Sequence, residues 1–155
     1  MAGIKGKFSG KDFKKLQEQM NKLAQQDKDA FITGCAKEIA ARLLGKVVKR
    51  TPVGVYPKST GKHGGTLRRS WTIQEMVKEG NVYRIDIVNP MEYASYVEYG
   101  HRQTPGRYVP ALGKRLKKGW VQGRFMLTIS EQEVQKLTPK LLEARLEKYL
   151  REAMG

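Results

Sequence analysis

Twelve residues, from Asn89 to Gly100, carry the signals of a complete short helix and constrain the fold more than any other stretch. Asn89 can cap the first turn, Pro90 suits the first helical position, and Glu92 suits the third, as in a capping box. Gly100 suits the left-handed residue that ends a helix. The residues that share one face of this helix are Tyr93, Tyr96, Val97 and Gly100. We therefore expect a short helix whose tyrosines, together with Tyr99, pack against a neighbouring sheet.

Apolar residues at helical spacing predict two helices before this segment. The first runs from about residue 10 to 26 and has a narrow apolar stripe, which suits docking on a neighbouring surface. The second runs from about residue 28 to 49, starts near Asp27 and Asp29, and stops at Thr51-Pro52. The first stripe is Phe13, Leu16, Met20 and Leu23, and the broader second face includes Phe31, Cys35, Ile39, Leu43 and Val47. The second helix is therefore expected to be the long core helix.

A β-hairpin is predicted between the core helix and the central helix. Its first strand places Trp71 on an apolar face, residues 78–81 form the turn, and residues 83–87 form the second strand. The apolar positions are Leu67, Trp71, Ile73 and Val77 in the first strand and Tyr83, Ile85 and Ile87 in the second. Trp71 is expected in the core, although an exposed ring for stacking on nucleic-acid bases stays an alternative.

Residues 101–123 contain no acidic residue, and glycines and prolines interrupt regular structure throughout. We expect a long basic loop, with room for a turn or two of helix between Ala111 and Lys118. Its basic residues are interleaved with aromatic ones, a pattern that suits either nucleic-acid binding or an anchor in a protein interface. The candidate contact residues for a partner or DNA are Arg102, Arg107, Tyr108, Lys114, Arg115, Lys117, Lys118 and Trp120.

The C-terminal part of the chain leaves two alternatives open. Alternating apolar residues over Arg124–Ile129 predict a third strand, but a helix throughout fits as well. Ser130 opens a short helix to about Leu137 with a capping box, and Thr138-Pro139 caps a last helix up to Gly155.

These elements predict one α+β domain over residues 1–155. A small antiparallel β-sheet packs against the long core helix, and further helices lie towards the N- and C-termini. Residues 1–8 are basic and carry two glycines, so we expect a mobile arm there.

The chain carries 30 Lys and Arg residues against 15 Asp and Glu residues, a net charge of +15. A field of this sign attracts polyanions or acidic protein surfaces, although a merely solvated basic surface would look the same in composition. The sequence contains no signal-peptide pattern and no long apolar run, so we expect no membrane contact. Cys35 is the single cysteine, which excludes a disulfide framework within one chain and favours a cytoplasm as the compartment.

The sequence lacks the residue patterns of an enzyme. His63, His101 and Cys35 do not stand at metal-ligand spacing. Residues 59–62 invite an interpretation as a phosphate-binding loop, but His63 stands where Ser or Thr is required and no apolar strand leads in. Cys35 lies on an apolar helix face, which favours a buried thiol over a nucleophile. We therefore expect no catalytic, cofactor-binding or metal-binding residues.

Three motifs follow one another along the chain. They are Thr51-Pro52-Val53, then Gly65-Thr66-Leu67-Arg68-Arg69-Ser70-Trp71, and then Asn89-Pro90 followed by Tyr93-Ala94-Ser95-Tyr96-Val97-Glu98-Tyr99-Gly100. Together they resemble the signature of tail-component proteins of long-tailed bacteriophages, known as the "gp ten" family of lambda-like siphophages and as minor tail, tail-completion or neck proteins. The resemblance covers about residues 28–153, and the combination of motifs is more specific than any one of them.

The resemblance implies a structural α+β subunit of the virion, made in the cytoplasm of the bacterial host, with no catalytic residues to transfer. Such subunits form rings, often of six, between the tail tube and the head connector, where they complete or terminate the tail or join it to the head. The implied partners are further copies of the chain, the tail tube protein, head connector or neck proteins, and DNA passing through the ring. The motif residues carried over are Trp71, Asn89, Pro90, Glu92, Tyr93, Tyr96, Glu98 and Gly100.

This chain departs from the family pattern in two places. The loop between Thr51-Pro52 and Gly65 is longer than the compact form, and residues 101–123 are long and unusually basic. A basic nucleic-acid-binding module is the alternative function, and it predicts binding of free duplex DNA with a steep salt dependence.

Overall fold

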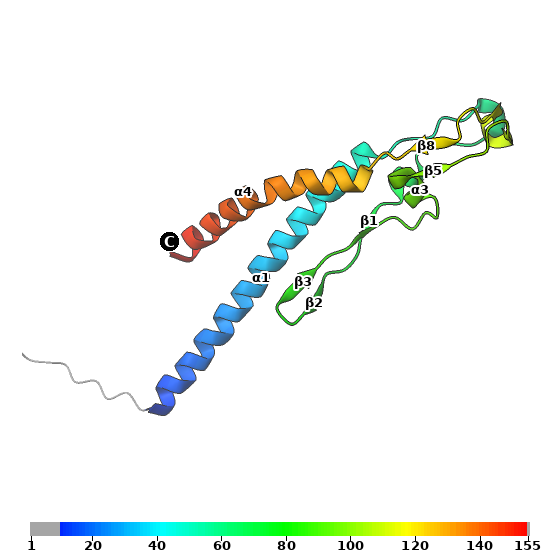
Figure 1. The fold of residues 1–155 in the computed structure, drawn as a ribbon. Helices are drawn as coiled ribbons and strands as arrows, with labels where there is room; N and C mark the ends of the chain where they lie inside the picture. The colour runs from blue at the N-terminus through cyan, green and yellow to red at the C-terminus, as the bar shows by residue number, and fades with distance from the viewer. Residues whose placement is uncertain (1–9, 155) are drawn as a thin grey trace, which may run out of the picture.

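The structure is a computed structural model that describes residues 10–154. The mobile arm expected at residues 1–8 lies outside the described residues. Two long helices, α1 (Gly10–Arg50) and α4 (Met126–Met154), pack together, and small antiparallel sheets lie beside and beyond them (Figure 1). The chain is therefore of the predicted α+β class.

α1 is one uninterrupted helix of 41 residues, where the sequence predicted two. The expected break contains neither Gly nor Pro, so nothing stops the first helix, and Asp27 and Asp29 lie inside α1 instead of at the start of a second helix. Asp29 accepts hydrogen bonds from Lys78 Nζ, at 2.9 Å, and from the Tyr83 hydroxyl, which tie the hairpin to α1. The predicted stop at Thr51-Pro52 is confirmed. The side chains of the expected docking stripe, Phe13, Leu16, Met20 and Leu23, lie outside the described set.

α4 begins at Met126, so Arg124–Ile129 leads into a helix and is not a strand. Met126, Ser130 and Val134 are buried at intervals of four residues, which is the spacing of a helix face. The alternation seen in the sequence was therefore misleading. Phe125, just before the helix, has a φ of 47° and marks the turn into it.

α4 also runs through Pro139, although the sequence predicted a short helix and then a separate last one. Pro139 cannot donate to the carbonyl of Gln135. Both residues are exposed, so water can bind the carbonyl that loses its partner. The proline ring also crowds that carbonyl, so the interior proline still costs about 3 kcal/mol. Contacts with α1 on both sides of Pro139, Arg50 with Glu133 and Glu38 with Arg145, hold α4 in one helix despite this cost.

α4 packs antiparallel along the C-terminal half of α1. The rings of Phe31 and Tyr149 lie 5.0 Å apart at one end of the contact, and Arg50 Nη2 binds Glu133 at 2.6 Å near the other. The buried cluster lies where the two helices meet the hairpin, and it consists of Val47, Leu67, Trp71 and Met126. The core is small for the length of the chain.

The predicted hairpin is confirmed from Thr72 onward, but the residues before it form a short helix. The elements are α2 (Thr66–Arg69), β1 (Thr72–Ile73), β2 (Val77–Glu79), β3 (Val82–Arg84) and β4 (Ile87–Val88). β1 pairs with β4 and β2 pairs with β3, across the turn Gly80-Asn81. Glu75 and Met76 stand opposite Ile85, a β-bulge that separates the two pairs. Leu67 therefore reaches the core from a helix and not from a strand.

The central helix, α3 (Ala94–Tyr99), is shorter than predicted and does not start at Asn89. Asn89 Oδ1 accepts a hydrogen bond from Met91 N at 3.2 Å, and its Nδ2 donates to Leu67 O at 2.8 Å, so this side chain links the turn to α2. Pro90 and Glu92 lie exposed in the turn before α3. Gly100 has a φ of 88° and a ψ of 171°, so it starts a strand and does not close the helix in the left-handed form.

Residues 101–123 form an extended antiparallel ribbon, where the sequence predicted a loop. Its elements are β5 (Gly100–Arg102), β6 (Tyr108–Val109), the 3-10 helix η2 (Pro110–Leu112), β7 (Lys114–Arg115) and β8 (Trp120–Gln122). β5 pairs with β8 and β6 pairs with β7. Gly106 and Gly113 have φ of 86° and 60°, so the glycines make the turns of a ribbon and do not dissolve it.

The ribbon projects away from the junction of the two long helices (Figure 1). Residues 53–65, which include the 3-10 helix η1 (Lys58–Thr60), run out beside it, and a Cβ on Gly113 would lie 4.0 Å from Pro57 Cγ near the tip. From here on, the arm means residues 53–65 and 101–123 together, and not the N-terminal residues 1–8.

Candidate assembly surfaces

Thr51 joins the first two sequence motifs in the buried core. Its hydroxyl donates to Val47 O at 2.7 Å and accepts a hydrogen bond from Trp71 Nε1 at 2.8 Å. Its carbonyl oxygen accepts two hydrogen bonds from the Arg68 guanidinium, at 2.9 and 2.7 Å. Trp71 is only 8% exposed, so it is a core residue as predicted and cannot stack on nucleic-acid bases. These motif residues hold the fold together.

Glu98 is a buried carboxylate that caps α4. Phe125 occupies the position before α4, where a phenyl ring cannot accept the free N–H groups of the first turn. Glu98 accepts hydrogen bonds from Leu127 N and Thr128 N, both at 2.9 Å, and from Thr128 Oγ1 at 2.7 Å. Its negative charge also suits a helix N-terminus. The sequence assigned capping to Glu92, within the same helix, but Glu98 performs it for a helix that starts 28 residues later.

Tyr93, Tyr96 and Tyr99 are largely exposed and do not bury the central helix on a sheet, contrary to the prediction. Their exposed fractions are 44%, 57% and 65%. Tyr96 alone of the three makes a ring contact with a described strand residue, since its ring lies 5.6 Å from the ring of His101 in β5. α3 has only six residues, and its inward face is supplied by Val97 and Glu98 together with Ala94. The three tyrosines are therefore left on the surface, near the base of the arm.

All eight candidate contact residues lie on the arm, and all eight are exposed. Arg102 stands directly opposite Trp120 in the ribbon, and Tyr108 stands opposite Arg115. The Arg115 guanidinium lies 6.0 Å from the Tyr108 ring centroid and donates to Gly106 O at 2.8 Å. The remaining members of the set are Arg107, Lys114, Lys117 and Lys118. Strand pairing in the ribbon thus places basic and aromatic side chains next to one another.

The arm also concentrates the positive charge of the chain. It contains eight of the Lys and Arg residues and none of the Asp and Glu residues. Lys58 and Lys62 add to the six on the ribbon. An extended surface of one sign attracts anions, because no neighbouring carboxylate neutralises it.

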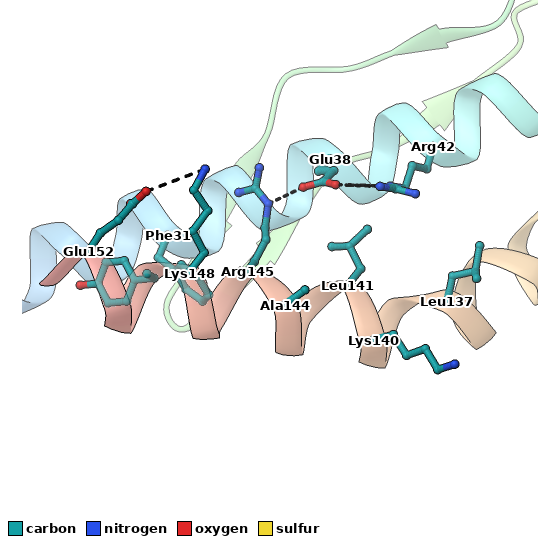
Figure 2. A pocket seen from close by; sticks show the side chains of 11 residues that line it. Phe31, Glu38, Arg42, Leu137, Lys140, Leu141, Ala144, Arg145, Lys148 and Glu152 are labelled. Atoms are coloured by element: carbon teal, nitrogen blue, oxygen red, sulfur yellow. Dashed lines mark hydrogen bonds and ion pairs between the residues drawn. The ribbon is translucent and has the colours of Figure 1, made fainter. Parts of the chain in front are cut away.

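A groove of about 680 Å³ lies between α1 and α4 (Figure 2). Glu38 on α1 lies between Arg145 of α4 and Arg42, one helical turn further along α1. The hydrogen bond from Arg145, followed by that from Arg42, holds the pKa of Glu38 below its ordinary value of 4.5. Lys46 and Arg50 likewise lower the pKa of Glu133. These ion pairs join α4 to α1 at two places along the helices, one around Glu38 and one around Glu133.

Hydrogen bonds to Asp29 fix the hairpin on α1. The Asp29 carboxylate raises the pKa of Lys78, and it also raises the pKa of the Tyr83 hydroxyl. Both shifts arise mainly from the hydrogen bond to Asp29, which favours the protonated partner.

The described residues hold no group of three His, Cys, Asp or Glu side chains placed to bind a metal ion. Cys35 is buried, as its position on the apolar face predicted. Across this part of the chain, every helix is too short or too polar to cross a bilayer. The described residues expose three surfaces: the arm, the tyrosines Tyr93, Tyr96 and Tyr99, and the leucines Leu142, Leu146 and Leu150 of α4.

Comparison with known proteins identifies the family. The model of the family described as "Bacteriophage HK97-gp10, putative tail-component" matches residues 14–100, which is more than half of the chain. The match ends at Gly100, where the ribbon begins. No curated protein and no solved structure matches the chain. Because one family model spans α1, the hairpin and α3 without interruption, the chain belongs to the HK97-gp10-like family of bacteriophage tail components.

Proposed function

We propose that this tail component is a structural subunit, and not an enzyme, that assembles with copies of itself into a ring, expected as a hexamer, between the tail tube and the head connector. In this position it would complete or terminate the tail, or join it to the head. The observation that carries the proposal is that the subunit exposes far more surface than a compact monomer of its mass. The chain exposes 12691 Å², whereas a compact monomer of its mass exposes about 7,900 Å². A subunit of this shape is suited to being covered by neighbours.

The distribution of surfaces supports a ring. A closed ring needs a head-to-tail interface, in which two different patches of each subunit meet. The arm lies at one end of the molecule, and the N-terminal half of α1 lies at the other (Figure 1). By sequence the two ends differ in charge, since the arm carries eight Lys and Arg residues and no acidic one, whereas residues 10–27 carry four Lys residues and three acidic ones.

The arm is proposed to contact a polyanion. DNA that passes through the ring and an acidic surface on the tail tube or connector both fit its acid-free charge. Six basic residues would make the contact with the help of two aromatic ones: Arg102, Arg107, Lys114, Arg115, Lys117 and Lys118, with Tyr108 and Trp120.

Mass spectrometry of purified phage particles, with heads and tails separated, tests the proposed position. We expect a few copies of the chain per tail, in the tail or neck fraction. Absence from particles would refute the structural role and would favour the basic nucleic-acid-binding module. That alternative predicts binding of duplex DNA by the isolated subunit, with log affinity falling against log salt at a slope of about −0.9 per phosphate contacted.

Neutralising the arm tests its role. A variant with the six basic ribbon residues changed to Gln should leave the fold intact and should stop attachment of heads to tails in a complementation assay. The control changes six exposed lysines of α1 and α4 to Gln, so that net charge falls equally: Lys14, Lys28, Lys37, Lys49, Lys136 and Lys140. If both variants lost infectivity to the same degree, net charge and not the arm would be responsible.

A further inference from the structure

Four exposed aromatic side chains gather where the ribbon joins the helices. They are Tyr96, Tyr99, Trp120 and Phe125, and the exposed fraction of each lies between 37% and 65%. They come from α3, from β8 and from the turn before α4. The pairing of β5 with β8, and the contact of α3 with β5, bring these segments together (Figure 1). We call these four residues the aromatic patch.

Contacts at the base of the ribbon hold the rings of the patch in place. The Tyr99 ring lies edge-on to the Phe125 ring, with 6.5 Å between their centroids. The backbone N–H of Phe125 donates to Glu98 O at 3.0 Å, which fixes the turn that carries this ring. Trp120 lies against Gly100, because a Cβ built on Gly100 would be 2.9 Å from Trp120 Cζ2. Rings held in this way lose little side-chain freedom when a partner binds, so they are suited to anchor an interface.

The charged residues around the patch are nearly all basic. Residues 93–130 contain seven Lys and Arg residues and a single acidic one, Glu98. Glu98 is buried, and its carboxylate accepts hydrogen bonds from the first turn of α4, so a partner cannot reach it. Arg102 stands opposite Trp120 in the ribbon, and Arg124 is exposed in the turn before α4. The patch therefore combines large apolar rings with positive charge that no carboxylate of this stretch neutralises.

We propose that the aromatic patch, together with the basic ribbon beside it, binds an acidic surface on another protein of the tail or neck, and not DNA. The exposed rings would enter apolar sites on that partner, and the Lys and Arg residues would meet its Asp and Glu residues around them. This inference rests on the proposed role of the arm and identifies the chemistry of its partner.

Duplex DNA does not account for the aromatic rings. Its base faces are stacked inside the helix, so Tyr and Trp rings cannot stack on them unless the duplex is opened. Its outer surface consists of phosphates and sugars, which basic and polar side chains contact. Trp, Tyr and Arg are, by contrast, the residue types that contribute most to protein–protein contacts.

A second copy of the chain is also a poor occupant of this surface. Each copy has a net charge of +15, so a basic surface on one repels the basic surface of another. Contacts between copies in the proposed ring would then use other surfaces. The charge around the patch is complementary to an acidic protein.

Binding of the full-length chain to DNA-free phage structures tests the proposal. Two probes come from a phage whose gene for this chain is disrupted: its tails, and its heads after they are emptied of DNA and treated with nuclease. A short synthetic DNA duplex is the third probe. We expect the chain to co-sediment with the tails or the emptied heads at about 150 mM salt. Tyr99→Ala and Trp120→Thr should each weaken that binding at least about tenfold, and both should leave binding of the duplex unchanged.

Val82→Thr is the control substitution. Val82 is an apolar residue of β3, 65% exposed, and it lies on the hairpin away from the patch (Figure 1). This variant should bind all three probes like the parent chain. Tyr99 lies on α3, outside the paired strands, so Tyr99→Ala still tests the patch if Trp120→Thr disturbs the ribbon. Circular dichroism at the helix band checks that each variant is folded.

Three results would overturn the proposal. Full-strength binding to the tails or emptied heads by both Tyr99→Ala and Trp120→Thr would remove the aromatic patch from the interface. Failure of the parent chain to bind either DNA-free structure would refute a protein partner, and binding of the duplex by itself would then assign the arm to DNA. Duplex binding that falls with the same two substitutions would also assign the patch to DNA.

The binding result and the particle result can fail separately. If the chain is present in particles and both patch variants bind like the parent, the place in the tail stands and the partner surface is refuted. If the chain binds tails or emptied heads through the patch but is absent from finished particles, the partner surface stands and the place in the tail is refuted.

Discussion

Replacing Glu98 by Ala should destabilise the fold strongly, because this carboxylate caps a helix from outside it. The substitution removes three hydrogen bonds, two of them to backbone N–H groups in the first turn of α4. Loss of a cap costs about 1 kcal/mol. The lost charge at a partly buried helix start costs about 1 kcal/mol more, and the hydrogen bond to Thr128 Oγ1 contributes about 1 kcal/mol.

We therefore expect Glu98→Ala to lower the free energy of unfolding by about 3 kcal/mol. For a chain of this length, that corresponds to a fall in melting temperature of about 9 °C. Urea titration followed by circular dichroism at the helix band measures the free energy directly. Glu98→Gln keeps one oxygen to accept a backbone N–H but removes the charge, so it should cost about half as much.

Glu92 supplies the matched control, because it has the same side chain, lies six residues earlier in the same motif, and is exposed. Glu92→Ala should change the free energy of unfolding by less than about 0.5 kcal/mol. The reasoning would be refuted if Glu92→Ala were the more damaging substitution. It would also be refuted if Glu98→Ala cost less than about 1 kcal/mol.

Two further predictions concern the base of the arm and the contact between the long helices. Gly100→Ala should disrupt the pairing of β5 with β8, because its Cβ would lie 2.5 Å from Val121 O at a φ of 88°. Gly80→Ala, with a φ of 61° and open space around it, should cost only about 1 kcal/mol. Amide hydrogen exchange in the ribbon distinguishes the two variants, and equal protection in both would contradict the prediction. Because the pKa values of Glu38 and Glu133 are lowered in the folded chain, the stability they contribute is present above about pH 4.5 and is lost as the pH falls further. Thermal unfolding between pH 6 and pH 3 should show the double variant Glu38→Gln/Glu133→Gln losing less stability with acid than the parent chain, and parallel curves for the two proteins would contradict this.

For the signature motifs, the sequence predicted local features but not the contacts between distant residues. It predicted the helix stop at Thr51-Pro52 and the burial of Trp71 correctly, because both follow from local chemistry. Pro52 and Gly54 follow Thr51 closely and together disfavour a helix, and a large ring on an apolar face is buried. It did not predict that Thr51 and Trp71 bind each other, since 20 residues separate them. The sequence offered one sign that Glu98 has a structural role, namely a carboxylate among the apolar side chains of the central motif. Nothing in the sequence indicated that the helix it caps is α4.

For the arm, the sequence predicted the character of the surface but not the path of the backbone. The composition of residues 101–123 correctly indicated an exposed basic surface with aromatic residues, since charge and exposure depend little on the path of the backbone. The glycines and prolines were interpreted as residues that interrupt regular structure, whereas Gly106 and Gly113 form turns of a paired ribbon. Strand pairing is decided by hydrogen bonds between distant residues, such as His101 with Val121, and local spacing does not report it.

The sequence by itself determined some local conformations and the overall charge of this protein. Helical spacing, the glycine of the Gly80 turn and the net charge of +15 all follow from residues close together in the chain or from simple counts. Only the tertiary structure decided that α1 runs without a break, that Glu98 caps α4, and that three tyrosines remain in water. Each of these outcomes depends on which distant surfaces meet, and a short helix cannot turn every apolar side chain towards a small core. The surfaces left uncovered are therefore the ones through which a tail component can meet its neighbours.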